Sequence, residues 1–379
     1  MLNQRRVFSA APFFDEESIV GIVAEIKSVL KSGMLTDGLH VKSFENQFAQ
    51  YIQSRYAVAV NSGTAALEIM LRFFGIEGKE VIIPTNTFVA TPTSVLFCGG
   101  VPVFADINAT TLCIDPEDVK RRITPKTVGV IAVHIAGLIC PEINELRELC
   151  HSNGLFLIED AAHAHGAVID TKKAGNLCDG GAFSFYPTKV MTTGQGGMIT
   201  TNNSELAVVA QKMRDHGLNS DRIMVMLGDN WCMSEITAII GKYQLANLDR
   251  FVEKRNEIAK RYNHALAKNP YVSLFQTPVN ICHSYYKYSL KLNGIDKGKV
   301  ALALKKDFGI DTGSIYYPPC HLHPWYMANF NTCEGNLPVS ETVLKDVLCL
   351  PIHLGITVET IDYVVDSLNT CISRVSDGK

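Results

Sequence analysis

The chain has 379 residues, which is long enough for a large domain of several layers and a smaller domain beside it. Hydrophobic residues make up 47% of the sequence and charged residues 19%, as expected of a globular protein with a sizeable core. The formal net charge of -3 argues against nucleic acid or an acidic membrane surface as the main partner.

Apolar runs and cysteines indicate the compartment. The longest apolar runs, such as residues 128–136, are too short to cross a bilayer, and no apolar signal core follows the polar residues 1–6. The eleven cysteines are scattered from Cys98 to Cys371 and form no C-x-x-C pair. Such cysteines are typical of buried thiols in a reducing compartment. We therefore expect a cytoplasmic protein without a zinc or other metal site.

Helices and strands are expected to alternate along the first two thirds of the chain. Helical periodicity predicts helices over residues 15–32, which Gly33 can end, and 41–53. Strands are predicted over residues 55–60, 80–84, 101–106, 128–134, 155–160, 182–186 and 198–201, and helices between them over 64–74, 91–98 and 142–152. This alternation predicts an α/β fold, with a mostly parallel central sheet flanked by helices on both faces. Ligands of such sheets bind at the carboxyl ends of the strands.

The pattern changes after about residue 250. A long charged helix is predicted over residues 234–267, a strand over 285–292 and a final helix over 357–373. We therefore expect a large domain over residues 1–250 and a smaller C-terminal α+β domain over residues 251–379, with the long helix running through the boundary.

Residues 61–66, which read NSGTAA, lie where a predicted strand ends and a helix begins. Small residues let backbone N–H groups approach an anion there, and the helix N-terminus favours negative charge. A tight turn with an ordinary helix N-cap would give the same pattern. The segment by itself leaves both interpretations open.

The predicted strand over residues 155–160 delivers a carboxylate, Asp160, to its carboxyl end, with His163 just beyond it. A carboxylate in this position can hold a protonated pyridine nitrogen, so that the ring acts as an electron sink. A ring could also rest on His163. The competing interpretations are a helix N-cap for Asp160 and a hydrogen-bonded loop residue for His163.

Lys189 follows the aromatic strand segment FSFYPT, and Gly194 and two further glycines allow a tight return of the chain. Partial desolvation would favour its neutral amine, which Schiff-base chemistry requires. A single lysine is more often solvated surface. The case for chemistry depends on its position 29 residues after Asp160, with the hydroxyl of Ser184 five residues before it. Phe88 follows another strand end, and it could stack on a cofactor ring or belong to the core.

Four segments in this order resemble the DegT/DnrJ/EryC1/StrS aminotransferases. They are NSGT at residues 61–64, PTNTF at 84–88, EDAAH at 159–163 and SFYPTK at 184–189, and the likeness extends from residues 32–38 to 350–353. The resemblance implies the fold of the pyridoxal 5'-phosphate (PLP)-dependent transferases of fold type I. It also implies an aminotransferase that mostly acts on keto sugars.

The resemblance assigns roles to individual residues. Lys189 would form the Schiff base with PLP and move the proton, and Asp160 would pair with the pyridine nitrogen. The other cofactor contacts that it implies are Gly63, Thr64 and Ser184 at the phosphate, Phe88 over one ring face, His163 beside the phenol oxygen and Asn230 from the other subunit of a homodimer. The family usually carries a basic residue where this chain has Cys232. The substrate or helix-end contact that such a residue would make is therefore not assigned to Cys232.

The implied reaction is a ping-pong transfer of an amino group from glutamate or glutamine to a nucleotide-linked 3- or 4-keto-6-deoxy sugar. A keto-cyclitol such as scyllo-inosose is an alternative acceptor. Sugar dehydratases on the same fold carry a histidine at the position of Lys189, which argues against that activity. The intact Lys189, Asp160 and Ser184 argue against a catalytically silent regulator. No G-x-G-x-x-G follows the first strand, which argues against a Rossmann dehydrogenase.

Two segments with aromatic and basic residues, 283–288 and 316–323, suit a base and a diphosphate. Within them we expect substrate contacts from His321, Tyr317 and Tyr285. Ordinary strand and loop residues would match the same segments.

Overall fold

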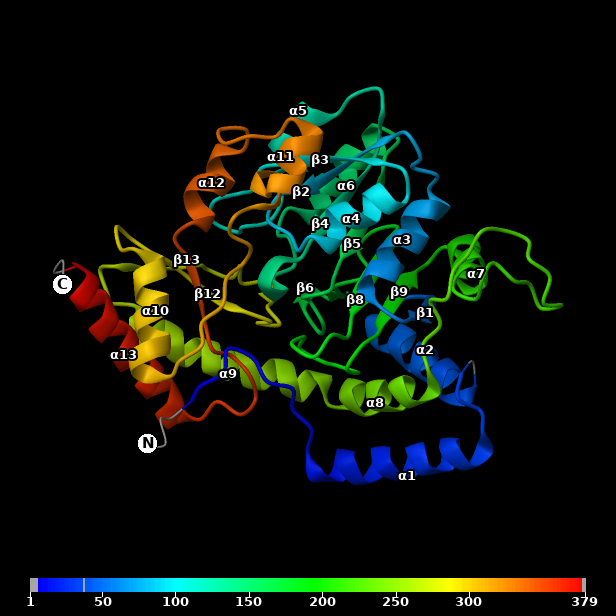
Figure 1. Ribbon diagram of the computed structural model, residues 1–379, viewed down its shortest axis with the longest axis horizontal. Coiled ribbons are helices and arrows are strands. Elements are labelled where there is room, and N and C mark those ends of the chain that lie inside the picture. The colour runs from blue at the N-terminus through cyan, green and yellow to red at the C-terminus, as the bar shows by residue number, and fades with distance from the viewer. Residues whose placement is uncertain (1–5, 37, 377–379) are drawn as a thin grey trace.

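The computed structural model describes residues 6–36 and 38–376. The expected domains and the likeness over residues 32–38 also include residues 1–5, 37 and 377–379, which lie outside the described residues. At its centre is a seven-stranded sheet in the order β1-β9-β8-β5-β4-β2-β3 (Figure 1). The strands are β1 (Tyr56–Val60), β2 (Glu80–Pro84), β3 (Val101–Ala105), β4 (Thr127–Val133), β5 (Phe156–Asp160), β8 (Gly180–Ser184) and β9 (Gly197–Thr201). Neighbours from β3 to β8 pair in parallel, whereas β9 is antiparallel to β8 and β1. The predicted α/β fold with a mostly parallel sheet is confirmed.

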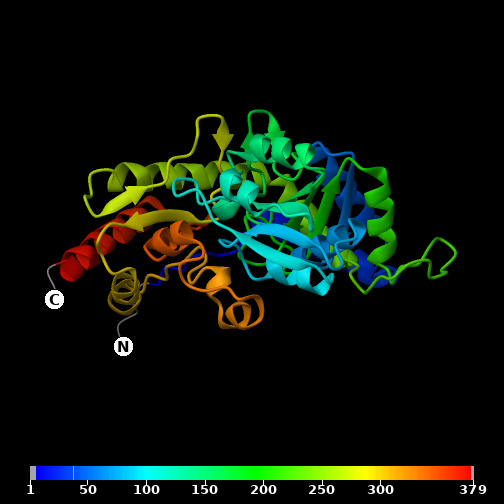
Figure 2. The same cartoon turned by 90° about the horizontal axis from the view of Figure 1, so that it is seen from above.

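Both faces of this sheet are buried because successive side chains of a strand point to opposite sides. In β4, Val130 packs in one core with Phe44, whereas its neighbour Ile131 packs in another core with Met70. Helices lie on both sides of the strands (Figure 2). They are α2 (Leu39–Ile52), α3 (Gly63–Phe73), α4 (Ala90–Phe97), α5 (Pro116–Arg122), α6 (Ile143–Ser152) and α7 (Ser204–Met213). The sequence pattern did not predict α5 or α7.

The first helix, α1 (Glu16–Ser32), matches its prediction. The side chain of Asp15 accepts a hydrogen bond from the backbone N–H of Ser18, and Gly33 ends the helix at a positive φ of 73°. These residues supply the cap and the left-handed turn that helix ends favour.

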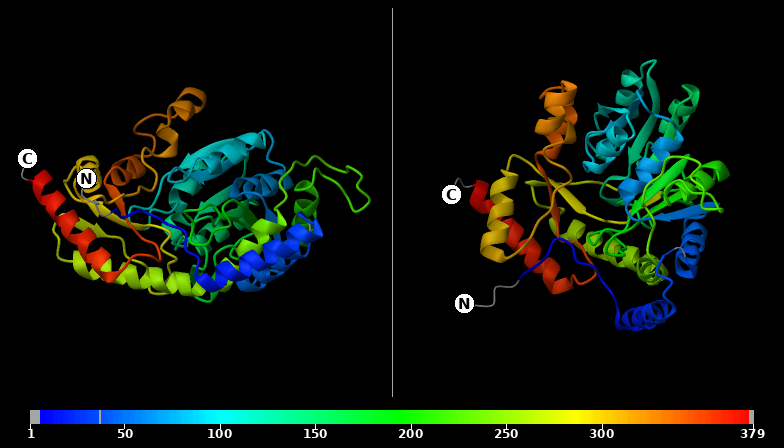
Figure 3. Two further views of the ribbon diagram at one scale, coloured as in Figure 1. Left: turned by 60° about the horizontal axis from the view of Figure 1, so that its bottom comes forward. Right: turned by 45° about the vertical axis from the view of Figure 1, so that its right-hand side comes forward.

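The single helix predicted over residues 234–267 was wrong. The structure has two helices there, α8 (Glu235–Ala246) and α9 (Leu248–Leu266), which follow one another along the bottom of the molecule (Figure 3). At Asn247 the side-chain amide donates to the carbonyl oxygen of Tyr243 at 3.0 Å, while the backbone N–H turns to Gln244. A side chain that competes for the carbonyl four residues back can bend a helix, and the φ of -102° and ψ of 0° at Asn247 depart from usual α-helical values. The expected domain boundary after residue 250 falls inside α9 and stays a prediction.

A smaller antiparallel sheet lies in the C-terminal part. It consists of β10 (Val272–Leu274), β12 (Tyr288–Leu292) and β13 (Val347–Leu350), and α10 (Lys297–Phe308) and α13 (Val358–Ser376) lie beside it (Figure 1). Leu290, Leu348 and Leu368 share its core. The strand predicted over residues 285–292 begins only at Tyr288, because Tyr285 has a φ of 47°, outside the extended region.

Short elements lie in the segments between the longer helices and strands of the two sheets. They are η1 (Ile135–Gly137), β6 (Val168–Ile169), β7 (Lys172–Lys173), β11 (Ile281–Cys282), η2 (Cys320–Leu322), α11 (Pro324–Phe330) and α12 (Pro338–Leu344). A Cβ at Gly137 would lie 2.3 Å from Ser284 Oγ and 3.0 Å from the backbone nitrogen of Tyr286. Glycine therefore lets the segment before β12 pack on the end of β4. In the described part of the chain, no helix is both long and apolar enough to cross a membrane.

Candidate active site

A cavity of about 540 Å³ opens beside the last residues of β5 and β8, at the carboxyl edge of the sheet. Parallel strands bring the residues that follow them to this edge, where ligands of such sheets bind. Seven of the predicted site residues line the cavity: Gly63, Thr64, Phe88, Asp160, His163, Ser184 and Lys189.

The N-terminus of α3 forms one end of the cavity. Ser62 Oγ accepts a hydrogen bond from the backbone N–H of Ala65, so Ser62 caps the helix. Gly63 and Thr64 are the first helical residues, whose N–H groups have no partner within a helix. A Cβ at Gly63 would lie 2.8 Å from Ser184 Cβ, so only glycine allows this close approach. The N-cap interpretation of the NSGT segment is confirmed, whereas anion binding stays a prediction, with the first N–H groups of the helix and Ser184 at the cavity.

Asp160 is held at the base of the cavity. Thr91 Oγ1 donates to Asp160 Oδ2 at 2.8 Å, and the backbone N–H of Ala162 donates to Oδ1 at 3.2 Å. Thr91 Oγ1 in turn lies 2.7 Å from the hydroxyl of Thr87. Asp160 caps no helix, since the next element along the described chain after β5 is the strand β6 (Val168–Ile169). These contacts fix the direction in which the carboxylate faces.

Lys189 lies on the cavity wall after β8. Its ammonium nitrogen is 4.7 Å from the centroid of the Tyr286 ring. Burial lowers the pKa of Lys189 below its ordinary value, Lys287 adds to this effect, and Tyr286 and Asp160 oppose it. A lowered pKa increases the share of neutral amine, which is the nucleophilic and basic form.

Aromatic rings surround His163. Its ring stacks on Tyr286 with centroids 4.3 Å apart, and its Nε2 lies 3.0 Å from the Tyr316 hydroxyl. Its buried Nδ1 has no hydrogen-bond partner among the described residues. Burial lowers the pKa of His163 well below its ordinary value, and Lys189 and Lys287 lower it further, so the imidazole is neutral. Phe88 is 56% exposed and tilts toward Tyr316 across the cavity mouth.

Among the lining residues that sequence reasoning missed are Thr91, Tyr286, Lys287 and Tyr316. Each belongs to a segment whose composition was already conspicuous, at residues 84–91, 283–288 or 316–323. Only the folded chain brings these three segments together, because the first precedes the other two by nearly 200 residues.

The structure places none of the three predicted substrate contacts at this cavity. His321 is fully buried, with Nδ1 at 2.7 Å from Thr85 Oγ1 and Nε2 at 2.9 Å from Glu341 Oε1. Both ring nitrogens are therefore used inside the chain. Tyr317 carries Lys297 over its ring, and Tyr285 stacks on His283 beside a different, smaller cavity. His321 thus has no ring nitrogen left for a ligand, and Tyr317 and Tyr285 lie outside the lining of the main cavity.

Asn230 also lies outside the cavity of its own chain. Its backbone carbonyl accepts a hydrogen bond from the side chain of Asn61 at 2.9 Å, and its own side chain is exposed. A contact with a second subunit remains a prediction. The thiol of Cys232, where a basic residue was expected from the resemblance, donates to the carbonyl of Arg214 at 3.2 Å.

Comparison with known proteins identifies the class. A family model described as the DegT/DnrJ/EryC1/StrS aminotransferase family matches residues 18–369. The GDP-perosamine synthase of Caulobacter vibrioides is 34% identical over 88% of this chain and 90% of its own. The dTDP-3-amino-3,4,6-trideoxy-alpha-D-glucose transaminase of Streptomyces venezuelae is 33% identical over 100% of both chains. Two structures of Spr1654 from Streptococcus pneumoniae, which is 26% identical, superpose on this chain. The PMP-form has a TM-score of 0.91 and covers 99% of both chains. The PLP-form has a TM-score of 0.90 and covers 98% of this chain and 99% of its own.

The fold and the site therefore define a PLP-dependent transferase of fold type I, with a seven-stranded, mostly parallel sheet and a smaller antiparallel one. The chain belongs to the DegT/DnrJ/EryC1/StrS aminotransferase family, as its four motifs predicted.

Proposed function

We propose that this chain binds PLP and transfers an amino group from glutamate or glutamine to a nucleotide-linked 3- or 4-keto-6-deoxy sugar. The observation that carries the proposal is the meeting of Lys189, Asp160 and the α3 N-terminus around one cavity. An amine, a carboxylate and an anion-binding helix end are the three groups that a phosphorylated pyridine aldehyde requires.

The side chains present fit this cofactor. Gly63 removes the Cβ that would block the space between α3 and Ser184, which leaves room for a phosphate at the first N–H groups of the helix. His163 has a buried Nδ1 with no protein partner among the described residues, and Phe88 presents an exposed ring. Gly63, Thr64 and Ser184 would hold the phosphate, Asp160 the ring nitrogen, and His163 and Phe88 the ring.

When bound, PLP supplies an aldehyde that captures amines and a ring that accepts the electron pair released at the substrate carbon. Lys189 would hold the aldehyde and then move a proton to or from the substrate carbon, for which its lowered pKa provides a neutral amine. Asp160 would keep the ring nitrogen protonated, and Thr91 would keep the carboxylate in place. Tyr316 would hold His163.

The names of the relatives support a nucleotide-linked acceptor but not one nucleotide, since a GDP and a dTDP enzyme have nearly equal identity to this chain. We propose a homodimer as the assembly, with Asn230 of each chain reaching the other's phosphate site. The cytoplasm remains the expected location.

The assignment of Lys189 is tested by borohydride reduction of the PLP-loaded protein, followed by peptide mass spectrometry. We expect the adduct on Lys189, and Lys189→Ala should lose turnover and the reducible adduct while it still binds PLP noncovalently. An adduct on another lysine would overturn the assignment.

The acceptor is tested by mixing the pyridoxamine form with a panel of keto-sugar nucleotides and with scyllo-inosose, and following the return of the PLP absorbance. We expect the fastest return with a nucleotide-linked keto sugar. Return with scyllo-inosose alone would establish the cyclitol alternative. Loss of a substrate hydroxyl without amination would establish a dehydratase.

A further inference from the structure

Lys287 is a second cation on the wall of the candidate site. It lines the same cavity as Lys189, and its ammonium nitrogen lies 5.2 Å from the centroid of the same Tyr286 ring that Lys189 approaches to 4.7 Å. The two nitrogens are therefore no more than about 10 Å apart. Within the described ranges, the Lys287 ammonium has no ion pair and no hydrogen bond. The buried Arg255, in contrast, already has hydrogen-bond partners within the chain, because it donates to the carbonyls of Tyr285 and Ile352.

The backbone fixes the position of Lys287. Its N–H donates to the carbonyl of Ala136 at 3.1 Å, and Ser284 of the same segment donates from its N–H to Gly137 at 3.1 Å. Ser284 Oγ also donates to the carbonyl of His163 at 3.0 Å. The segment that carries Lys287 is thus attached to the ends of β4 and β5. A charge on such a rigid base is suited to bind a ligand with a defined orientation.

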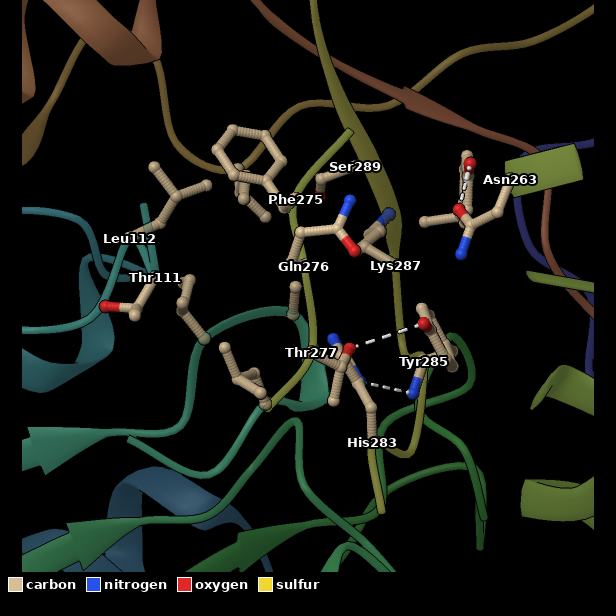
Figure 4. Close-up of a pocket in the computed structure, with 15 residues that line it drawn as sticks. Thr111, Leu112, Asn263, Phe275, Gln276, Thr277, His283, Tyr285, Lys287 and Ser289 are labelled. Carbon is tan, nitrogen blue, oxygen red and sulfur yellow. Dashed lines mark hydrogen bonds between the residues drawn. The ribbon is translucent and has the colours of Figure 1, made fainter. Parts of the chain in front are cut away.

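Lys287 borders two cavities of the described chain, and of these the main cavity has room for an organic anion. The other is a chamber of about 30 Å³, which it borders together with Gln276, Thr277 and His283 (Figure 4). In that chamber, Tyr285 is held by a hydrogen bond to Thr277 and by one to His283. A volume of this size accepts water but no amino acid. An anionic partner of Lys287 must therefore come from the main cavity.

The chemistry of transamination requires such a partner for the donor. The α-carboxylate of an amino acid is bonded to the carbon whose proton Lys189 would move, so it must lie within a few ångströms of that lysine. Lys189 cannot supply the counter-charge because it acts as a neutral amine. His163 cannot supply it either, because burial keeps it neutral. The diphosphate of a nucleotide sugar, in contrast, is separated from the reacting ketone by the sugar ring.

We propose that Lys287 is the counter-charge that binds the α-carboxylate of the amino-acid donor. This inference rests on the proposed function, and it adds a residue that selects the donor. Lys287 is then free to face the neutral sugar in the second half-reaction.

The test separates the two half-reactions in the PLP-loaded protein. Stopped-flow absorbance follows the first half-reaction with L-glutamate, L-glutamine and 4-aminobutyrate, which lacks the α-carboxylate. We expect Lys287→Gln to raise the apparent dissociation constant of L-glutamate or L-glutamine by about tenfold or more, as the loss of a charge-assisted contact does. It should leave the apparent dissociation constants of 4-aminobutyrate, and of the keto-sugar nucleotide in the second half-reaction, within about twofold of the wild type.

Three variants complete the test. In Lys287→Met the side chain has nearly the same length but no charge, and this variant should behave like Lys287→Gln. Agreement between the two would exclude an effect of the glutamine side chain itself. Lys287→Arg retains the charge and should recover part of the preference for L-glutamate. Lys291→Gln, in β12 and outside the cavity lining, should match the wild type.

The outcomes distinguish the inference from the function on which it rests. Equal donor binding in wild type and both neutral variants, or an effect confined to the keto-sugar half-reaction, would overturn the role of Lys287 and leave the aminotransferase intact. A wild-type protein whose PLP spectrum responds to no amino acid would instead refute the proposed function.

Discussion

Three buried histidines near the candidate site make the stability of the folded chain depend on pH. Burial lowers the pKa of His163, His165 and His283, in the case of His283 to about 3. In the unfolded chain the imidazole has an ordinary pKa near 6.5, so the unfolded state takes up the proton first as the pH falls. The stability that depends on neutral His283 is therefore fully present above about pH 6.5 and declines as the pH falls toward 3.

We predict that His283→Asn makes the protein less sensitive to acid. His283 Nδ1 accepts a hydrogen bond from the backbone N–H of Tyr285 at 2.8 Å, and the asparagine oxygen can accept the same bond. Between pH 7 and pH 5 the free energy of unfolding of the wild type should fall by about 2 kcal/mol more than that of the variant. Urea denaturation at the two pH values measures this difference. The exposed His264 provides the control His264→Asn, which should follow the wild type. Equal pH dependence in His283→Asn would contradict the prediction.

At the scale of elements, the junction of β1, α3 and β8 creates the anion site. The first turn of α3 packs so closely on the end of β8 that a Cβ at Gly63 would lie 2.8 Å from Ser184 Cβ and 3.2 Å from the carbonyl of Phe183. The α3 N-terminus can approach the cavity because its first residue has no side chain. The position of this helix end, more than any single side chain, determines where a phosphate can bind.

We predict that Gly63→Ala weakens cofactor binding without unfolding the protein. The added methyl group must push α3 away from Ser184, which lengthens several contacts to the phosphate at once. We expect the PLP dissociation constant to rise by about tenfold, as the loss of one or two charge-assisted hydrogen bonds does. Equilibrium dialysis with PLP measures it, with thermal denaturation as the check on folding. Gly298→Ala, in the first turn of α10, is the matched control, because its Cβ would meet only Asp296 Oδ1 at 3.2 Å. Unchanged PLP affinity in Gly63→Ala would show that the phosphate lies elsewhere.

At the scale of the whole molecule, one segment extends away from the body. Residues 214–234, between α7 and α8, project at the right of the molecule in two perpendicular views (Figures 1 and 2). Apolar side chains in its middle are exposed, with Ile223 and Met224 at 59% and Leu227 at 73%, whereas Met233 at its end is buried. Apolar residues clustered on a projecting segment are typical of an interface. Asn230 belongs to this segment, which supports the proposed dimer with shared sites.

We predict that two defective variants complement each other. Asn230→Ala should weaken PLP retention although Lys189 and Asp160 are unchanged. In a mixed dimer with Lys189→Ala, one site would carry both lesions and the other would carry neither. Mixing the two variants under conditions of chain exchange should therefore restore up to half of the wild-type activity per mixed dimer. If Asn230 acts only within its own chain, each site keeps one lesion and no activity returns. A fully active monomer in analytical ultracentrifugation would also contradict the proposal.

The sequence by itself determined the fold class, the family and the local motifs. Alternating apolar strands and helices predicted the sheet, since the periodicity of a strand or helix is written in consecutive residues. The positions of Asp160 at the end of β5 and of Lys189 five residues beyond β8 could be read in the same way, because each is close in sequence to the strand that delivers it. Local patterns also had limits, as the break at Asn247 shows: helical periodicity continues across it, whereas the backbone there has a φ of -102° and a ψ of 0°.

Only the tertiary structure decided which distant side chains share the cavity. Tyr286 and Lys287 reach it because Gly137 lets their segment pack on the end of β4, a contact between residues about 150 positions apart. His321 resembled a substrate contact in the sequence, but the fold encloses it between Thr85 and Glu341. Sequence patterns report which face of an element is apolar. They do not report which residues from remote elements satisfy each other's hydrogen bonds and which stay unpartnered toward a ligand, because that depends on the packing of the whole chain.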